Sequence, residues 1–477
     1  MDLTSYLLGK KKGGGGGTIS LQDKSVTITE NTTTTIQKDA GYDGLGTVEI
    51  TTNVPQTGGT KENDVNFYDY DGILLYSYTK NEFAQLTEMP ENPVRAGLIA
   101  EGWNWSLSDA QAYVNNYGIL DIGQTYITDD GSTRLYVDLI EERKSPHVGL
   151  YINGTVNIDW GDNSAETEVT GSSLTTLVDT PHEYAHGGNY VISIKPQTGT
   201  SFKIQSSNVG ASILWGGSGS QPSINSHYWQ RLKKVELGSN VELGATAFGE
   251  MYNLEIVGFN KNVAVGGSNN FFNCYALKHI TIPLGKGYST QSLFTNCLSL
   301  EHVCCTKHKN TVDQNEFYNC PSLKRLCLGQ GVSFAGMINA NGIRDCRSLT
   351  DVIIPNVTLL SNASMSGNPL LRNIYLSPNI TTINSDTFSG DLSLTKIKVP
   401  KISRVSGYTF NTCVGMIEYD FTDFTSVPTL QNTNAFSQIQ SDCYIVVPDD
   451  LYEGWIATSN WSTLANYIIS ETDYNNL

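Results

Sequence analysis

The second half of the chain repeats one pattern at a nearly constant interval, and few folds accept such a period. An apolar anchor is followed six residues later by Leu or Met, and three residues further on usually by Val, Ile or Leu. The anchors are Phe248, Phe271, Phe294, Phe317, Ile343, Met365, Phe388 and Phe410, at intervals of 23, 23, 23, 26, 22, 23 and 22 residues. A period of about 20–29 residues with an L-x-x-[IVL]-x-[IVL] core predicts a leucine-rich solenoid, because each repeat buries its apolar face only against its neighbours.

The form F-x-x-C-x-x-L-x-x-[IV]-x-[IV]-P resembles the BspA-like leucine-rich repeat family, most closely in "CYALKHITIPLG", "CRSLTDVIIPNV" and "LSLTKIKVPKI". The resemblance implies a solenoid over residues 231–442 and a strand-and-helix cap over 443–477. It also implies a role in surface adhesion or recognition. Five cysteines occupy the position three residues after the anchor, where we expect a column of reduced core thiols, with disulfide bridging as the alternative: Cys274, Cys297, Cys320, Cys346 and Cys413.

The outward positions of the repeat strands are the candidate binding residues. Alternate side chains of a strand point to opposite faces, so those between the core positions should face solvent. Tyr can stack on sugar faces, while Asn, Asp and Lys can bond hydroxyl groups. The candidates are His279, Thr281, His302, Arg325, Asp351, Asn373, Tyr375, Lys396 and Lys398. Cys304 and Cys327 also take outward positions beside the two histidines, so a transition-metal site there is an alternative, although we predict no metal and no cofactor.

The first half of the chain predicts several smaller modules. Residues 18–54 alternate β-branched and polar residues and predict a small β module. Residues 63–142 predict a compact α+β module with a helix in "SLSDAQAYVNNYG", a turn at "DDGS" and an aromatic core that includes Trp103, Trp105, Tyr113 and Tyr117. Residues 201–230 are a connector before the solenoid. The predicted fold class is therefore mainly β and multidomain, with small β modules and an immunoglobulin-like β-sandwich before the solenoid.

Residues 182–186, His-Glu-Tyr-Ala-His, fit the H-E-x-x-H pattern of zinc proteases. That chemistry needs a helix, which places both histidines on one face, whereas Pro181 and Gly187-Gly188 flank this segment and an alternating strand follows it. "DWGDNS" followed by "HEYAHGGNYVISI" instead resembles a PKD-type immunoglobulin-like domain over residues 143–200. The resemblance implies that these residues stabilise turns and core in a spacer or binding module: Trp160, Gly161, Asp162, His182, Tyr184, Gly188 and Tyr190.

Charge and composition exclude some functions. With 30 basic and 47 acidic residues, the net charge of −17 disfavours nucleic acid as a partner. No apolar run is long enough for membrane insertion, and the basic residues follow the short apolar stretch at the N-terminus, so export through a signal peptide is not expected. No nucleophile elbow, P-loop or dinucleotide fingerprint is present, so we predict no enzyme, with a cell-bound polysaccharide hydrolase as a minor alternative.

Residues 1–17 join an apolar peptide to three lysines and five glycines, which indicates a docking peptide on a tether. The segments "LTSYLLGKK", "YDGLGTVEITTNV" and "GWNWSLSDAQAYV" together resemble modular virion proteins of bacteriophages that infect gut Gram-positive bacteria. The resemblance implies a tail or head fibre that attaches to other virion proteins through Leu3, Tyr6, Leu7 and Leu8. It would present the solenoid to a host-cell glycan or protein, as a trimer if it forms a fibre, although no heptad repeat enforces one. The alternatives are a virion decoration protein and a bacterial surface adhesin.

Overall fold

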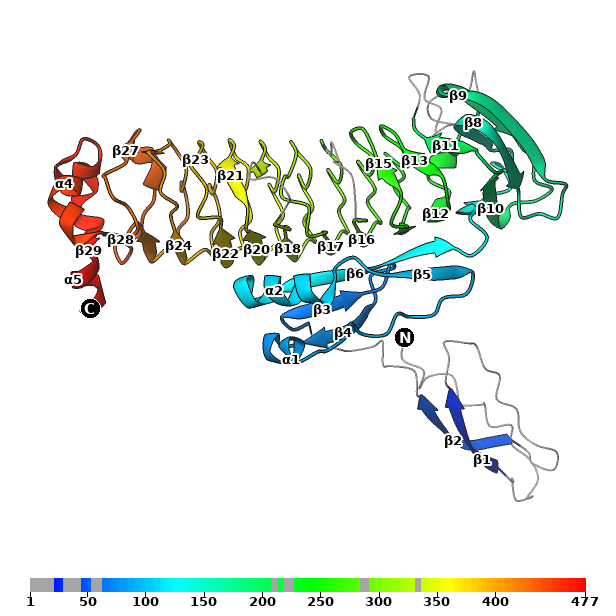
Figure 1. Cartoon of the computed structure of the whole chain (residues 1–477), viewed down its shortest axis with the longest axis horizontal. Coiled ribbons are helices and arrows are strands. Elements are labelled where there is room, and N and C mark those ends of the chain that lie inside the picture. The colour runs from blue at the N-terminus through cyan, green and yellow to red at the C-terminus, as the bar shows by residue number, and fades with distance from the viewer. Residues whose placement is uncertain are drawn as a thin grey trace, which may run out of the picture. The chain divides into compact units, whose positions relative to one another are not determined.

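The computed structural model describes residues 21–28, 44–52, 62–206, 213–217, 227–283, 291–330 and 336–477. The chain divides into two compact units, Met1–Thr60 and Lys61–Leu477. In the first unit, β1 (Leu21–Ile28) pairs in parallel with β2 (Gly44–Thr52). The predicted fold class, mainly β with a C-terminal repeat solenoid, is confirmed. The rest of this description concerns the second unit (Figure 1).

The solenoid carries one short parallel strand per repeat on a face that we call the ladder face. Its strands are β12 (Leu232–Glu236), β14 (Ile256–Gly258), β16 (His279–Thr281), β17 (His302–Cys304), β18 (Arg325–Cys327), β20 (Asp351–Ile354), β22 (Asn373–Leu376), β24 (Lys396–Lys398), β26 (Glu418–Asp420), β28 (Tyr444–Val447) and β29 (Ile468–Ser470). The opposite face carries β13 (Val241–Leu243), β15 (Ala264–Val265), β19 (Gly336–Ile338), β21 (Val357–Leu360), β23 (Thr382–Ile383), β25 (Arg404–Val405) and β27 (Thr429–Leu430). The strands follow one another along the unit in chain order (Figure 1).

The predicted internal columns are present. Phe248, Phe271, Phe294 and Phe317 stack with successive ring centroids 5.8, 5.7 and 5.4 Å apart. Each aligned thiol donates to the carbonyl oxygen of the preceding anchor, as Cys297 Sγ does to the oxygen of Phe271 at 3.1 Å. All the aligned cysteines are buried and unbridged. The aromatic and thiol positions therefore fill the same place in every rung, as the repeat predicts.

Two turns in each rung need a left-handed backbone. The residues two before and two after the anchor have positive φ, for example Asn269 (62°) and Asn273 (60°) around Phe271. Asn, Asp and Gly tolerate this conformation best and supply most of these positions. The Asn296 side chain also donates to the Asn273 amide oxygen at 2.8 Å, and Asn319 donates to Asn296 at 2.8 Å. The amides thus link successive turns.

A curved sheet closes the N-terminal end of the solenoid. It is formed by β7 (Thr133–Leu139), β8 (His147–Asp159), β9 (Thr167–Pro181), β10 (Gly188–Pro196) and β11 (Ser201–Ile204). Hydrogen bonding runs from β12 through β7, β10, β8 and β11 to β13, so both faces of the first rung continue into these strands. The buried residues of this sheet and of the solenoid form one apolar core. The strands therefore cover the otherwise open end of the core, which a solenoid requires for solubility.

The remaining N-terminal elements form a four-stranded sheet with two helices. The strands are β3 (Val65–Tyr68), β4 (Leu74–Tyr78), β5 (Leu98–Trp103) and β6 (Leu120–Thr128), in the order β4-β3-β6-β5. The helices are α1 (Lys80–Ala84) and α2 (Leu107–Tyr117). The predicted helix is confirmed as α2, with Ser106 as N-cap and Gly118 at its end with φ of 90°. We call residues 62–128 the docked module, because β7, predicted as its last strand, instead joins the curved sheet.

The C-terminal elements follow the last repeats. They are η2 (Thr433–Phe436), η3 (Asp449–Leu451), α4 (Tyr452–Ala457), η4 (Trp461–Tyr467) and α5 (Glu471–Asn475). Trp455 and Trp461 are fully buried and belong to the solenoid core. None of the helices in the described ranges is long and apolar enough to cross a membrane.

Candidate recognition surface

The docked module lies along the first half of the ladder face, which corrects the expectation that all outward strand positions are exposed. His279 is 1% exposed, His302 is 6% and Arg325 is 8%. Thr281 is also buried, since Gly123 of β6 packs directly against its side chain. These four predicted binding residues therefore contact the chain's own N-terminal module. Figure 1 shows α2 and β6 running beside β16–β20.

Side-chain donors of the module bind backbone carbonyls of the repeats. Asn104 Nδ2 donates to the oxygen of Cys304 at 2.9 Å, and Trp105 Nε1 donates to that of Cys305 at 2.8 Å. The Tyr113 hydroxyl donates to the oxygen of Leu328 at 2.6 Å. All three donors are buried, so losing any acceptor would leave a polar group unsatisfied. The aromatic residues predicted as core are thus both core and docking groups.

Arg325 and the two histidines form the buried polar centre of this interface. Arg325 Nη2 lies 2.5 Å from Asp121 Oδ1, and its Nη1 donates to the Asn63 carbonyl at 2.7 Å. The Tyr68 ring stacks on His302, with centroids 4.4 Å apart. Burial, together with His302, lowers the pKa of His279 to about 3, so this imidazole is neutral at physiological pH. The group is buried inside this interface and is therefore closed to an external ligand.

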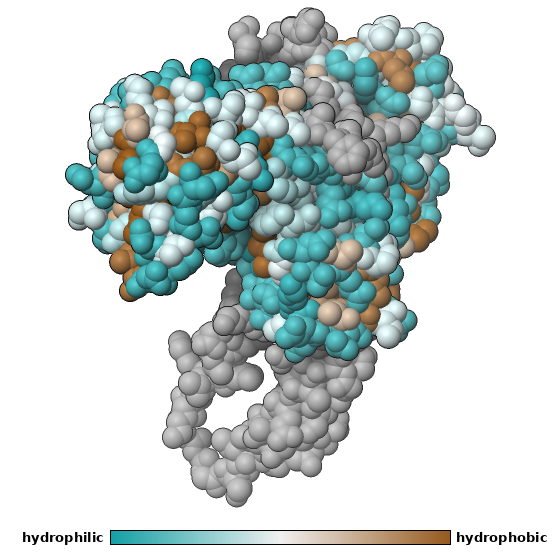
Figure 2. Space-filling model, turned by 60° about the vertical axis from the view of Figure 1, so that its left-hand side comes forward, coloured by the Kyte–Doolittle hydropathy of each residue, from teal (hydrophilic) through white to brown (hydrophobic). Residues whose placement is uncertain are grey.

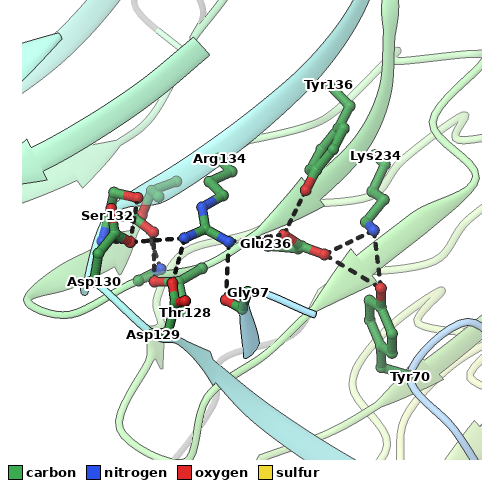
Figure 3. Close-up of polar contacts among 12 residues, drawn as sticks. Tyr70, Gly97, Thr128, Asp129, Asp130, Ser132, Arg134, Tyr136, Lys234 and Glu236 are labelled. Atoms are coloured by element: carbon green, nitrogen blue, oxygen red, sulfur yellow. Dashed lines mark hydrogen bonds and ion pairs between the residues drawn. The ribbon is translucent and has the colours of Figure 1, made fainter. Parts of the chain in front are cut away.

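Glu236 joins three parts of the unit (Figure 3). Its carboxylate lies 2.7 Å from Lys234 Nζ on the same strand and accepts from the Tyr136 hydroxyl of β7 at 2.8 Å and from the Tyr70 hydroxyl of the docked module at 3.2 Å. Arg134 Nη1 lies 3.9 Å away and also donates to the Gly97 carbonyl. Burial and Glu236 raise the pKa values of both tyrosines, so they remain neutral donors. The cluster is a structural junction between the module, the curved sheet and the first rung.

The ladder face is open from β22 onward. Of the remaining predicted residues, Asn373, Lys396 and Lys398 are exposed, while Asp351 and Tyr375 are half-buried. Asn373 Nδ2 donates to Asp351 Oδ1 at 2.7 Å. Tyr375 packs edge-on against Tyr117 of the docked module, with ring centroids 4.8 Å apart. The structure thus keeps a smaller candidate surface at the border of the docked module.

The two lysines of the open ladder form ion pairs across neighbouring rungs. Lys396 Nζ lies 2.6 Å from Glu418 Oε2, and Lys398 Nζ lies 3.1 Å from Asp423 Oδ2. Such exposed pairs contribute little stability, so a ligand can exchange them at small cost. On the side seen in Figure 2, hydrophobic residues form separate patches within a mostly polar surface.

A groove of about 410 Å³ opens on this part of the ladder face, between β22 and β24. Its lining combines apolar, aromatic and charged groups: Ile374, Tyr375, Leu376, Pro378, Lys398, Val399, Pro400, Lys401 and Asp423. Two of the predicted residues, Tyr375 and Lys398, therefore line one concave site. Sequence reasoning missed the rest because their positions in the repeat are core or turn positions.

The H-E-x-x-H segment forms no helix, as predicted. His182 Nε2 lies 2.8 Å from Asp162 Oδ2, and its ring stacks on Trp160 with centroids 4.4 Å apart. The Tyr184 hydroxyl donates to the Trp160 carbonyl at 2.9 Å. Although burial opposes it, hydrogen bonds from Ser164 and His182 lower the pKa of Asp162 to about 2. These residues tie a turn to the core of the curved sheet.

The cysteines beside the histidines are part of the docking interface. Cys304 and Cys327 are buried, and Cys327 packs into the core of the docked module. Burial raises the pKa values of both thiols, which therefore remain protonated. No cluster of three metal-ligating side chains occurs within the described ranges. The predicted attachment residues Leu3, Tyr6, Leu7 and Leu8 lie outside those ranges.

A signal for the docked module was present in the repeat itself. From the anchor Phe271 onward, the outward position ten residues later carries Thr281, Cys304, Cys327, Ile353 and Tyr375, and only then Lys398 and Asp420. Small and apolar residues at nominally exposed positions of successive strands indicate a covered face. The change to charged residues marks where the cover ends.

A match to a known protein family supports the repeat assignment. Residues 223–337 and 333–417 match the BspA type leucine-rich repeat region family, in six copies. No curated protein matches the chain. A leucine-rich cell surface protein from Faecalibacterium prausnitzii A2-165 is 18% identical, with a TM-score of 0.24, over 53% of this chain and 83% of that one. A leucine-rich repeat protein from Bacteroides ovatus ATCC 8483 is 17% identical, with a TM-score of 0.23, over 56% and 91%.

Proposed function

We propose that this chain, with its BspA-type repeat region, is a non-enzymatic recognition protein that binds a cell-surface glycan or protein through the open part of its ladder face. One observation carries the proposal: the outward residues of the earlier strands are buried, whereas Asn373, Lys396 and Lys398 remain exposed beside a groove. Concave sites with a few convergent polar groups are the usual place for ligands.

The finer proposal is a bacteriophage fibre that attaches to the virion through residues 1–17. The resemblance of the whole module series to virion proteins supports it, and so does the tether-like composition of those residues. Many copies on one particle would raise avidity by ~10²–10⁴, so each site needs only weak affinity. A bacterial surface adhesin would use the same open ladder face with a different attachment.

The test is a titration of fluorescently labelled full chain on a panel of intact gut Gram-positive bacteria. We expect saturable binding to at least one strain, weakened about tenfold by the double variant Tyr375→Ala/Lys398→Ala, because both side chains line the groove. The matched control, Tyr275→Ala/Lys278→Ala, removes the same residue types from an exposed turn and should bind as the native chain does. Absence of saturable binding to every strain, or equal loss in both variants, would refute the proposal.

A further inference from the structure

The hydrogen-bonded ladder is interrupted between β22 and β24. In the other rungs nearby, the amide of the residue seven after the anchor donates to its counterpart in the preceding rung, as Arg372 does to Thr350 and Ile417 to Thr395. No such bond joins Thr395 to Arg372, although both residues are described. The two strands accordingly belong to separate sheets. Each strand therefore has an unpaired edge at the groove.

The interruption also exposes residues that are core elsewhere. The positions nine and eleven after the anchor are buried in every other described rung, for example Val352 and Ile354 in β20, and Ile397 and Val399 in the rung after the groove. In β22 the same positions hold Ile374 and Leu376, which are only half-buried. The groove thus has an apolar floor flanked by free backbone donors and acceptors. That combination is typical of sites that bind an added strand.

The docked module contacts the ladder at another sheet boundary. The ladder is also interrupted between β14 and β16, where β6 of the docked module lies over the boundary. There the amide of Tyr126 in β6 donates to the carbonyl oxygen of Phe259, at the edge of β14, at 3.1 Å. A backbone amide of the docked module thus bonds a rung carbonyl beside this boundary. The groove continues from the docking interface, because Tyr375 contacts Tyr117 on one side and lines the groove on the other.

We propose that the groove between β22 and β24 binds an extended peptide, which pairs its backbone with the free edge of β22 and inserts alternate apolar side chains over Ile374 and Leu376. Lys401 is exposed at the rim and favours a carboxylate on the peptide. This inference rests on the proposed recognition function and specifies its ligand class. A surface protein with an extended segment fits the site better than a glycan, which has no regular backbone donors to match a strand edge.

The test begins with a displayed random dodecapeptide library panned on the full chain, followed by fluorescence titration of synthetic peptides from the enriched clones. We expect alternating apolar residues and at least one acidic residue. Leu376→Asp should weaken binding at least about tenfold, and Lys401→Glu, which lies outside the core, about threefold. The matched control Leu392→Asp places the same charge at an exposed leucine of the next rung and should change affinity less than about twofold.

A second measurement needs no protein variant. Successive amides of a strand point to opposite sides, so N-methylation of alternate residues in one register should abolish binding, while methylation in the other register should not. Equal effects of both registers, or peptides indifferent to Leu376→Asp and Lys401→Glu, would overturn the peptide site. If the full chain still binds bacteria and only a glycan array yields ligands, the peptide proposal fails while the recognition function stands. If neither peptides nor cells bind, both fail.

Discussion

At the scale of single residues, the rungs differ at one position where the chemistry matters for stability. The residue three after the anchor is Cys in five rungs, but Asn368 and Asp391 in two others. The backbone N–H of Asn368 donates to Asp391 Oδ1 at 2.8 Å. Asp391 Oδ2 has no hydrogen-bond partner among the described residues. Burial raises the pKa of Asp391 well above its ordinary value, so the native fold favours the protonated acid.

Asp391→Asn should therefore stabilise the protein increasingly as the pH rises. A folded-state pKa above the unfolded value means that the group's contribution is complete below the unfolded pKa and is lost as the pH rises through the folded pKa. Asparagine keeps the acceptor for Asn368 but does not titrate. We expect little difference near pH 4 and a gain on the order of 1 kcal/mol in the free energy of unfolding near pH 8, measured in urea. A gain that is independent of pH would contradict this account.

The residue scale also shows how far the sequence predicts the rungs. The columns of Phe271, Cys297 and Leu300 follow from the period alone, because one position of every repeat occupies one place in the stack. The left-handed turns can also be predicted from the sequence, since Asn, Asp or Gly recurs two residues after most anchors. The partial exposure of Ile374 could not be predicted, because the sequence of its repeat does not distinguish it from the fully buried Val352.

At the scale of elements, the contact between β6 and β16 decides whether the module can dock. A Cβ at Gly123 would overlap the Thr281 side chain, whose Cγ2 lies 2.7 Å and Cβ 2.8 Å from that point. Gly123→Ala should lower the free energy of unfolding by about 1–3 kcal/mol, because the backbone of β6 must shift away from the ladder. The loss is measured by urea unfolding of the full chain.

The control for this variant is the compensating change in its neighbour. Thr281→Gly removes the overlapping atoms, so the double variant Gly123→Ala/Thr281→Gly should recover most of the stability that Gly123→Ala loses. Additive destabilisation by the two changes would show that the two strands are not in contact.

The repeat indicates that part of the ladder face is covered, but sequence patterns could not identify the segment that covers it, for a physical reason. The contacts join residues about 160–260 positions apart, such as Glu101 with Lys261 and Asn63 with Arg325. Contacts of this range leave no periodicity within either segment, unlike the stacking of adjacent repeats. The candidate site was consequently predicted too broadly. These positions do lie on the outer side of the repeat strands, but a segment about 200 residues away in the sequence covers half of them.

At the scale of the whole second unit, the N-terminal elements cover two different surfaces of the solenoid. The curved sheet closes the end of the core, and the docked module covers the first strands of the ladder face. Both reduce the exposed apolar surface and the number of unpaired strand edges, which promote aggregation of an open solenoid. The open part of the ladder face is thereby confined to the rungs from β22 onward.

The covered ladder face is the central claim, and histidine labelling with diethyl pyrocarbonate tests it most directly. The reagent modifies accessible imidazoles, and mass spectrometry reports each site separately. In the native full chain, His279 and His302 should remain unmodified while the exposed His186 and His308 react, and all four should react in urea. Native-state modification of His279 and His302 at the rate of His186 would show that the ladder face is open and would contradict the account.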